Sequence, residues 1–202
     1  NIVKLQIGIG IQYGPKPFAE GMHKYIFLSE FPKICLNVWR KLKMLSIAFV
    51  IPYEGKLPEY FGLWLMTCGS NPSIDFLVFT DDTTVYKYPT NVKPTFFSKG
   101  ELGELIQKSF DFKVNIERPY KFCDYRPAYG EIFADYLRGY DFWGHCDIDL
   151  FWGNIRKFVT DDILRRYNRI YTRGHCCLYR NTTEVNAWYR ELPRCGCQDW
   201  KE

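Results

Sequence analysis

The sequence has no hydrophobic run that approaches the length of a transmembrane helix, and no segment resembles a signal peptide with its cleavage site. It also has little excess of one charge, with 27 basic against 23 acidic residues. This small and diffuse excess does not indicate nucleic-acid binding, although it suits an anionic small molecule. We therefore expect no transmembrane segment and no nucleic-acid partner.

The eight cysteines have no regular spacing and include no C-x-x-C pair. Several lie in apolar stretches, where a free cysteine behaves as a small buried hydrophobe. A reducing compartment fits this usage better than a disulfide scaffold does, so we expect a cytoplasmic protein, with a peripheral membrane contact as an alternative. A zinc-stabilised interaction module is a weaker alternative, and its candidate ligands are His145, Cys146, His175, Cys176, Cys195 and Cys197.

The composition is that of a folded chain, with 47% hydrophobic and 18% aromatic residues in a length of 202. Residues 1–44 form an N-terminal extension of unclear status, interrupted by Gly14, Pro15 and Pro17. Because Met44 directly precedes a clear strand pattern, we expect the native domain to begin there and to occupy residues 45–202. The chain does not begin with Met, and we expect it to be a fragment or a processed product.

From residue 45 the pattern alternates between strands and helices, which predicts an α/β fold with a mostly parallel sheet. The expected strands are 46–53, 74–80, 92–98, 140–149 and 169–179, and the expected helices are 61–68, 101–110 and 127–137. In such sheets ligands bind beyond the carboxyl ends of the strands. Polar clusters follow three expected strands, at Pro52-Tyr53-Glu54, Asp81-Asp82 and Asp147-Ile148-Asp149. Their agreement predicts a nucleotide pocket at this edge.

The third cluster has the form D-x-D. Because side chains on a strand alternate between faces, Asp147 and Asp149 are expected to project to the same side, about 7 Å apart. A divalent metal bound to a diphosphate would offset the repulsion between the two carboxylates. Hard oxygen ligands favour Mg²⁺ or Mn²⁺. The alternative is a surface turn with two solvated aspartates.

Eight strings carry a resemblance: Ile47–Tyr53, Phe79–Asp82, Arg118–Lys121, Cys123–Asp124, Pro127–Gly130, Phe142–Asp149, Thr172–His175 and Leu178–Asn181. Together they resemble a family of uncharacterised, mainly bacterial glycosyltransferases, over about Ser46 to Asn181. The string Trp-Gly-His-Cys-Asp-Ile-Asp at 143–149 is the most specific part. That family is similar to the metal-dependent nucleotide-sugar transferases of the GT-A fold. The resemblance implies a GT-A-like, Rossmann-type three-layer sandwich and a role in polysaccharide biosynthesis.

The same resemblance implies a nucleoside diphosphate sugar as donor, with a UDP-sugar favoured, and a saccharide acceptor. It implies Mn²⁺ or Mg²⁺ as cofactor, held by Asp147 and Asp149. The implied nucleotide-sugar-binding residues are Ile51, Pro52, Tyr53, Asp81, Asp82, Lys121, Asp124 and Arg126, and those facing the sugar or acceptor are Trp143, Arg173 and His175. The alternatives are a surface ion-pair cluster for Lys121, Asp124 and Arg126, and a core role for Trp143.

The sequence departs from that family's pattern after Asn181, where few residues remain for an acceptor-binding region. We expect the chain to be truncated at its C-terminus, and no residue is assigned as a catalytic base. A non-catalytic domain that binds a nucleotide or sugar is therefore the second interpretation.

Overall fold

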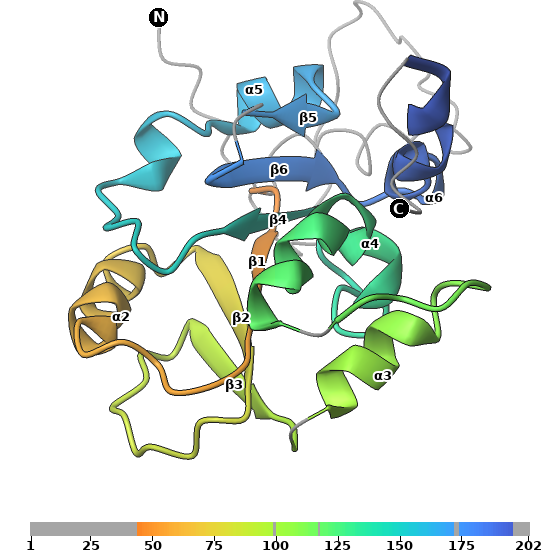
Figure 1. Ribbon diagram of the computed structural model, residues 1–202. Helices are drawn as coiled ribbons and strands as arrows, with labels where there is room; N and C mark the ends of the chain where they lie inside the picture. Colours follow the sequence, from red (N-terminus) through yellow and green to blue (C-terminus); the bar gives the residue numbers. More distant parts are fainter. Residues whose placement is uncertain (1–43, 99, 117, 172–173, 196–202) are drawn as a thin grey trace, which may run out of the picture. The chain divides into compact units, whose positions relative to one another are not determined.

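The computed structural model describes residues 44–98, 100–116, 118–171 and 174–195 (Figure 1). Within these residues a six-stranded sheet has the order β3-β2-β1-β4-β6-β5. The strands are β1 (Ile47–Tyr53), β2 (Ile74–Thr80), β3 (Val92–Phe96), β4 (Phe142–Cys146), β5 (Arg169–Ile170) and β6 (Cys176–Arg180). Strands β1, β2, β3 and β4 pair in parallel, whereas β6 is antiparallel to both β4 and β5. The predicted α/β class and mostly parallel sheet are confirmed.

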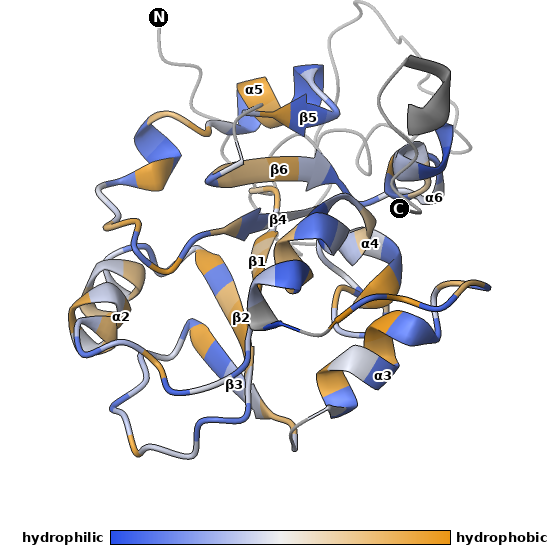
Figure 2. Ribbon diagram, viewed as in Figure 1, coloured by the Kyte–Doolittle hydropathy of each residue, from blue (hydrophilic) through white to orange (hydrophobic). Residues whose placement is uncertain are grey.

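Helical segments cover both faces of the sheet. The helices are α2 (Phe61–Gly69), α3 (Glu101–Gln107), α4 (Tyr129–Ile132), α5 (Asp161–Arg166) and α6 (Thr183–Asn186), and the 3₁₀ segments are η1 (Pro119–Ala128), η2 (Ile155–Lys157) and η3 (Trp188–Cys195). One core joins the sheet to α2, η2 and α5, and a second joins its other face to α3, η1, α4, α6 and η3. Figure 2 shows hydrophobic residues dominating β1 and β2, as expected of strands buried on both faces.

The order of the strands creates a switch point between β1 and β4. From β1 the chain passes through α2 to β2 on one side, and it later returns through α3, η1 and α4 to β4 on the other side (Figure 1). The carboxyl ends of these two parallel strands therefore open a crevice at the edge of the sheet. At the centre of β4, a side chain on Gly144 would run into the Cys177 carbonyl oxygen on β6. Only glycine allows this close approach of the two strands.

Three predicted elements differ clearly in the structure. The expected strand over 140–149 is shorter, because β4 ends at Cys146. The expected strand over 169–179 is wrong, because β5 and β6 are two antiparallel strands separated by a turn. The expected helix over 127–137 begins earlier, as the 3₁₀ segment η1, and contains only the short α-helix α4. Pro127, inside η1, has no backbone N–H and so cannot donate a regular i to i−4 hydrogen bond. Among the described residues, no helix combines the length and apolar character needed to cross a membrane.

Candidate functional site

A pocket of about 560 Å³ lies at the switch point, where the carboxyl ends of β1 and β4 meet η1 and the turn before β6. We call it the polar pocket. Its wall combines backbone and side chains from Val50, Ile51, Pro52, Tyr53, Glu54, Tyr60, Tyr120, Phe122, Cys123, Arg126, Tyr129, His145, Cys146, Asp147, Ile148, Asp149, Gly174 and His175. The two polar clusters predicted after β1 and after β4 therefore share one pocket.

Asp147 and Asp149 lie beyond the end of β4, in a turn closed by a hydrogen bond from the Leu150 N–H to the Asp147 carbonyl. The prediction that both project from a strand is therefore wrong. In this turn Asp147 is half-buried, Ile148 is buried and Asp149 is exposed. Both aspartates still line the polar pocket.

The Asp147 carboxylate has two side-chain partners. Arg126 forms an ion pair with its Oδ1, and the Nδ1 of His175 lies 3.0 Å from its Oδ2. The backbone N–H of Asp147 also donates to the His175 carbonyl oxygen at 3.0 Å. Arg126 in addition donates to the Gly174 carbonyl at 2.8 Å. A cation, a carboxylate and an imidazole thus meet at one edge of the pocket.

His145 supplies a neutral group to the same pocket. Its side chain is 5% exposed, and its Nδ1 is buried without a hydrogen-bond partner among the described residues. Burial, followed by the nearby positive charge of Arg126, lowers the pKa of His145 from 6.5 to about 3. The imidazole is therefore uncharged at neutral pH. The sequence gives His145 only as a candidate zinc ligand, because its position in this pocket depends on tertiary packing, which sets its ring beside those of Tyr129 and Tyr179.

The pocket also contains residues that the motif did not single out. Glu54, Tyr60 and Tyr120 line it beside the predicted Ile51, Pro52 and Tyr53. Glu54 belongs to the polar cluster Pro52-Tyr53-Glu54, and this position after β1 could have predicted it as a pocket residue. No periodicity marks Tyr60 or Tyr120, since they come from segments that meet only in the folded chain.

Asp81 and Asp82 do not line the polar pocket. The Asp81 carboxylate accepts a hydrogen bond from the Gly55 N–H at 2.6 Å, and Asp82 accepts one from the Leu57 N–H at 2.8 Å. Asp82 also accepts from the N–H and hydroxyl of Thr84, and the hydroxyl bond is the main cause that lowers the pKa of this carboxyl. Both residues thus hold the loop that follows β1, which in turn borders the pocket.

The structure also separates three other predicted residues from the pocket. Lys121 and Asp124 form an exposed ion pair, 3.0 Å between Nζ and Oδ2, as the surface-pair alternative expects, and neither lines the pocket, so their binding role stays a prediction. Trp143 is fully buried, and its Nε1–H donates to the Asn186 side chain at 2.7 Å. A contact between Trp143 and an acceptor is therefore wrong, and its core alternative is confirmed. Arg173 lies outside the described residues.

The donor set in the polar pocket fits a hard divalent cation. Its groups are the carboxylates of Asp147 and Asp149 and the imidazole of His175, and a cation would replace the 3.0 Å hydrogen-bond contact between Asp147 Oδ2 and His175 Nδ1. No three His, Cys, Asp or Glu side chains are grouped for metal binding in the part of the chain that the structure describes. Mg²⁺ and Mn²⁺ commonly bind through one or two protein carboxylates together with phosphate oxygens, so a site with few protein ligands is suited to them.

The cysteines that the structure describes with their side chains are free, and these are Cys68, Cys123, Cys146, Cys176 and Cys177. Burial raises the pKa of the Cys176 thiol to about 12, and it raises that of Cys146 as well. Both thiols are therefore protonated at neutral pH when no metal is bound. Cys197 lies outside the described residues.

Comparison with known proteins places the chain by sequence. No curated protein matches it. Residues 49–202 match a family described as being of unknown function, DUF6625, and this match includes β1 from Phe49 onward, all of β4 and the whole polar pocket. The chain therefore belongs to the family of unknown function DUF6625.

Proposed function

We propose that the chain is a metal-dependent glycosyltransferase with a GT-A-like fold, which transfers a sugar from a nucleoside diphosphate sugar to a saccharide acceptor. The observation that carries the proposal is the polar pocket at the β1–β4 switch point, where Arg126, Asp147, Asp149 and His175 meet. Nucleotides bind at such switch points in open α/β sheets. The sequence resemblance supports the same reaction class.

The charges of the pocket suit a diphosphate held through a cation. Asp147 and Asp149 would bind Mn²⁺ or Mg²⁺, with His175 beside them, and the ion would supply electrostatic stabilisation of the departing nucleoside diphosphate. Arg126 offers a second positive charge, and its planar guanidinium can donate two hydrogen bonds to phosphate oxygens. The buried, neutral His145 can hydrogen-bond a polar ligand atom without adding charge.

The nucleoside would lie against the carboxyl end of β1. Ile51, Pro52 and Tyr53 line this side of the polar pocket, and Tyr60 adds an aromatic ring that is 43% exposed. A flat base can stack on exposed aromatic rings. The loop after β1 is fixed by Asp81 and Asp82, so this wall is preorganised for the ligand. UDP is the favoured nucleotide.

Isothermal titration of UDP into the full chain, with and without Mn²⁺, tests the proposal. We expect metal-dependent binding, with the affinity at least about tenfold lower in Asp149→Ala because a metal-binding carboxylate is lost. Asp162→Ala is the matched control, since Asp162 is an exposed aspartate on α5 outside the pocket. UDP affinity that responds neither to the metal nor to Asp149→Ala would refute the proposal.

A non-catalytic nucleotide- or sugar-binding domain is the second candidate, because the polar pocket supports a donor site but no residue in it is assigned as a catalytic base. Incubation with UDP-sugars, Mn²⁺ and saccharide acceptors separates the two functions. Release of UDP with formation of a new glycoside, lost in Asp149→Ala, supports the transferase. Metal-dependent UDP binding without turnover supports the binding domain.

A further inference from the structure

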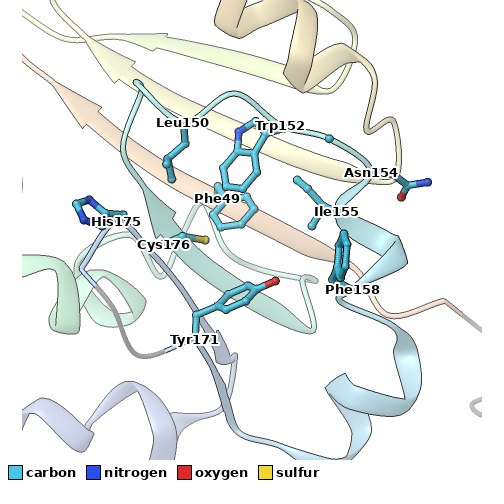
Figure 3. A pocket seen from close by; sticks show the side chains of 10 residues that line it. Phe49, Leu150, Trp152, Asn154, Ile155, Phe158, Tyr171, His175 and Cys176 are labelled. Atoms are coloured by element: carbon cyan, nitrogen blue, oxygen red, sulfur yellow. The ribbon is translucent and has the colours of Figure 1, made fainter.

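A second cavity of about 490 Å³ lies beside the polar pocket, on the face of the sheet that α2 covers (Figure 3). We call it the apolar cavity, and its wall consists of Phe49, Leu150, Trp152, Gly153, Asn154, Ile155, Phe158, Tyr171, His175 and Cys176. Phe49 of β1 is fully buried, and its ring stacks on that of Trp152 with centroids 5.5 Å apart. Figure 3 shows four aromatic rings arranged around the cavity.

Several polar atoms of this wall already have partners within the protein. The Asn154 side-chain oxygen accepts from the Lys157 N–H at 3.1 Å, and the Gly153 carbonyl accepts from the Asn71 side chain at 2.9 Å. The His175 Nδ1 lies against Asp147. A sugar buried here would leave several hydroxyls unpaired, which is costly. The cavity therefore suits an apolar group.

The outer rings of the cavity stay accessible. Phe158 is 66% exposed and Tyr171 is 47% exposed, although both are large and apolar. Tyr171 also has a positive φ of 63°. This left-handed backbone conformation is unfavourable for a bulky residue, and such strain often marks ligand-binding positions. The chain thus holds an aromatic ring at the cavity in a strained conformation.

The two cavities meet at His175, which lines both of them. We propose that the acceptor is an amphiphile, with its polar sugar at the D-x-D turn and an aliphatic chain in the apolar cavity. An aliphatic chain is flexible, so it can bend at His175 and fill the space between the aromatic walls. A rigid ring system cannot make this bend. The role of this molecule as acceptor rests on the proposed function, whereas its binding in the cavity does not.

Binding of alkyl β-glucosides to the full chain, below their critical micelle concentrations, tests the inference. Calorimetry gives the affinity, and tryptophan fluorescence reports on Trp152 in the wall. We expect the affinity to rise about fourfold for each methylene from hexyl to octyl, which corresponds to about 0.8 kcal/mol per buried methylene. Glucose alone should bind far more weakly, and phenyl glucoside should bind more weakly than hexyl glucoside.

Two variants locate the chain in the cavity. Phe158→Ala and Tyr171→Ala remove exposed parts of the wall and should each weaken octyl glucoside binding by about tenfold. Tyr167→Ala is the matched control, because Tyr167 is 56% exposed but does not line the cavity. Thermal unfolding confirms that each variant is folded, and the exposure of Phe158 makes its loss tolerable.

An affinity independent of chain length, or unchanged in the Phe158→Ala protein, would overturn the inference. Phenyl glucoside binding more tightly than hexyl glucoside would overturn the aliphatic assignment. The UDP titration is measured separately. Chain-length dependence without UDP binding would leave the cavity assignment intact and remove the proposed function. UDP binding without chain-length dependence would leave the proposed function intact and remove the cavity assignment.

Discussion

The burial of His145 links a single residue to the pH dependence of folding. Burial and the charge of Arg126 lower its pKa to about 3, whereas an unfolded histidine titrates near 6.5. Between these values the unfolded chain binds a proton that the folded chain does not. The free energy of unfolding should therefore fall as the pH falls from 6.5 toward 3, by up to about 1.4 kcal/mol per pH unit from this residue.

Urea unfolding at pH 6.5 and pH 5.0 measures this contribution. His145→Leu and His145→Gln both remove the titrating group, so each should lose about 1–2 kcal/mol less stability than the wild type over this interval. Leu and Gln differ in polarity, so agreement between them separates the titration from the effect of packing. A wild-type pH slope in both variants would contradict the assignment.

Individual residues also show the limits of prediction from sequence. The D-x-D pair could be placed at the pocket because its motif follows a buried strand, whereas Arg126 was implied only by the family resemblance. Asp81 and Asp82 follow a strand in the same way, yet their carboxylates bind backbone N–H groups of a neighbouring loop. Sequence spacing places a residue at a strand end, but the loop that reaches its side chain depends on tertiary structure.

At the scale of elements, the buried strands were the most predictable. Strand β1 is largely an apolar run, β2 is apolar apart from Asp75 and Thr80, and the helix after β1 has its buried residues at helical spacing. The hairpin β5–β6 was missed although Gly174, a residue typical of turns, lies between its two strands. The 3₁₀ segment η1 has no amphipathic period that would have predicted its extent.

The loop between β1 and α2 owes its shape to the carboxylates after β2. Removing the Asp82 side chain should free the Leu57 N–H, and Asp81→Ala should free the Gly55 N–H. We expect the amide of Leu57 to exchange with solvent about tenfold faster in Asp82→Ala, since a hydrogen bond to a charged group stabilises by about 1.5–3 kcal/mol.

Hydrogen exchange followed by mass spectrometry or NMR measures this opening. Asp135→Ala is the matched control, because Asp135 pairs with Arg138 on an exposed surface away from this loop. Its Leu57 amide should exchange at the wild-type rate. Unchanged protection of Leu57 in Asp82→Ala would show that the loop is held by other contacts.

For the described unit as a whole, Arg126 joins three segments that are distant in sequence. It lies in η1, pairs with Asp147 after β4, and donates to the Gly174 carbonyl before β6. Its guanidinium therefore closes one end of the polar pocket and neutralises a carboxylate that a divalent cation would also bind. Under the proposed function, arginine and metal would therefore compete for Asp147 until a diphosphate supplied additional oxygens for both.

This competition predicts opposite effects of one substitution on two ligands. Arg126→Gln frees Asp147, so Mn²⁺ alone should bind about tenfold more tightly, as measured by electron paramagnetic resonance. UDP in the presence of Mn²⁺ should bind about tenfold more weakly, because a charged donor to phosphate is lost. Arg138→Gln, which breaks an exposed ion pair with Asp135, should change neither affinity. A decrease or an increase in both affinities would contradict the competition. Arg126 would then act only by holding the fold, because its loss would disturb the whole pocket instead of letting Mn²⁺ replace the guanidinium at Asp147.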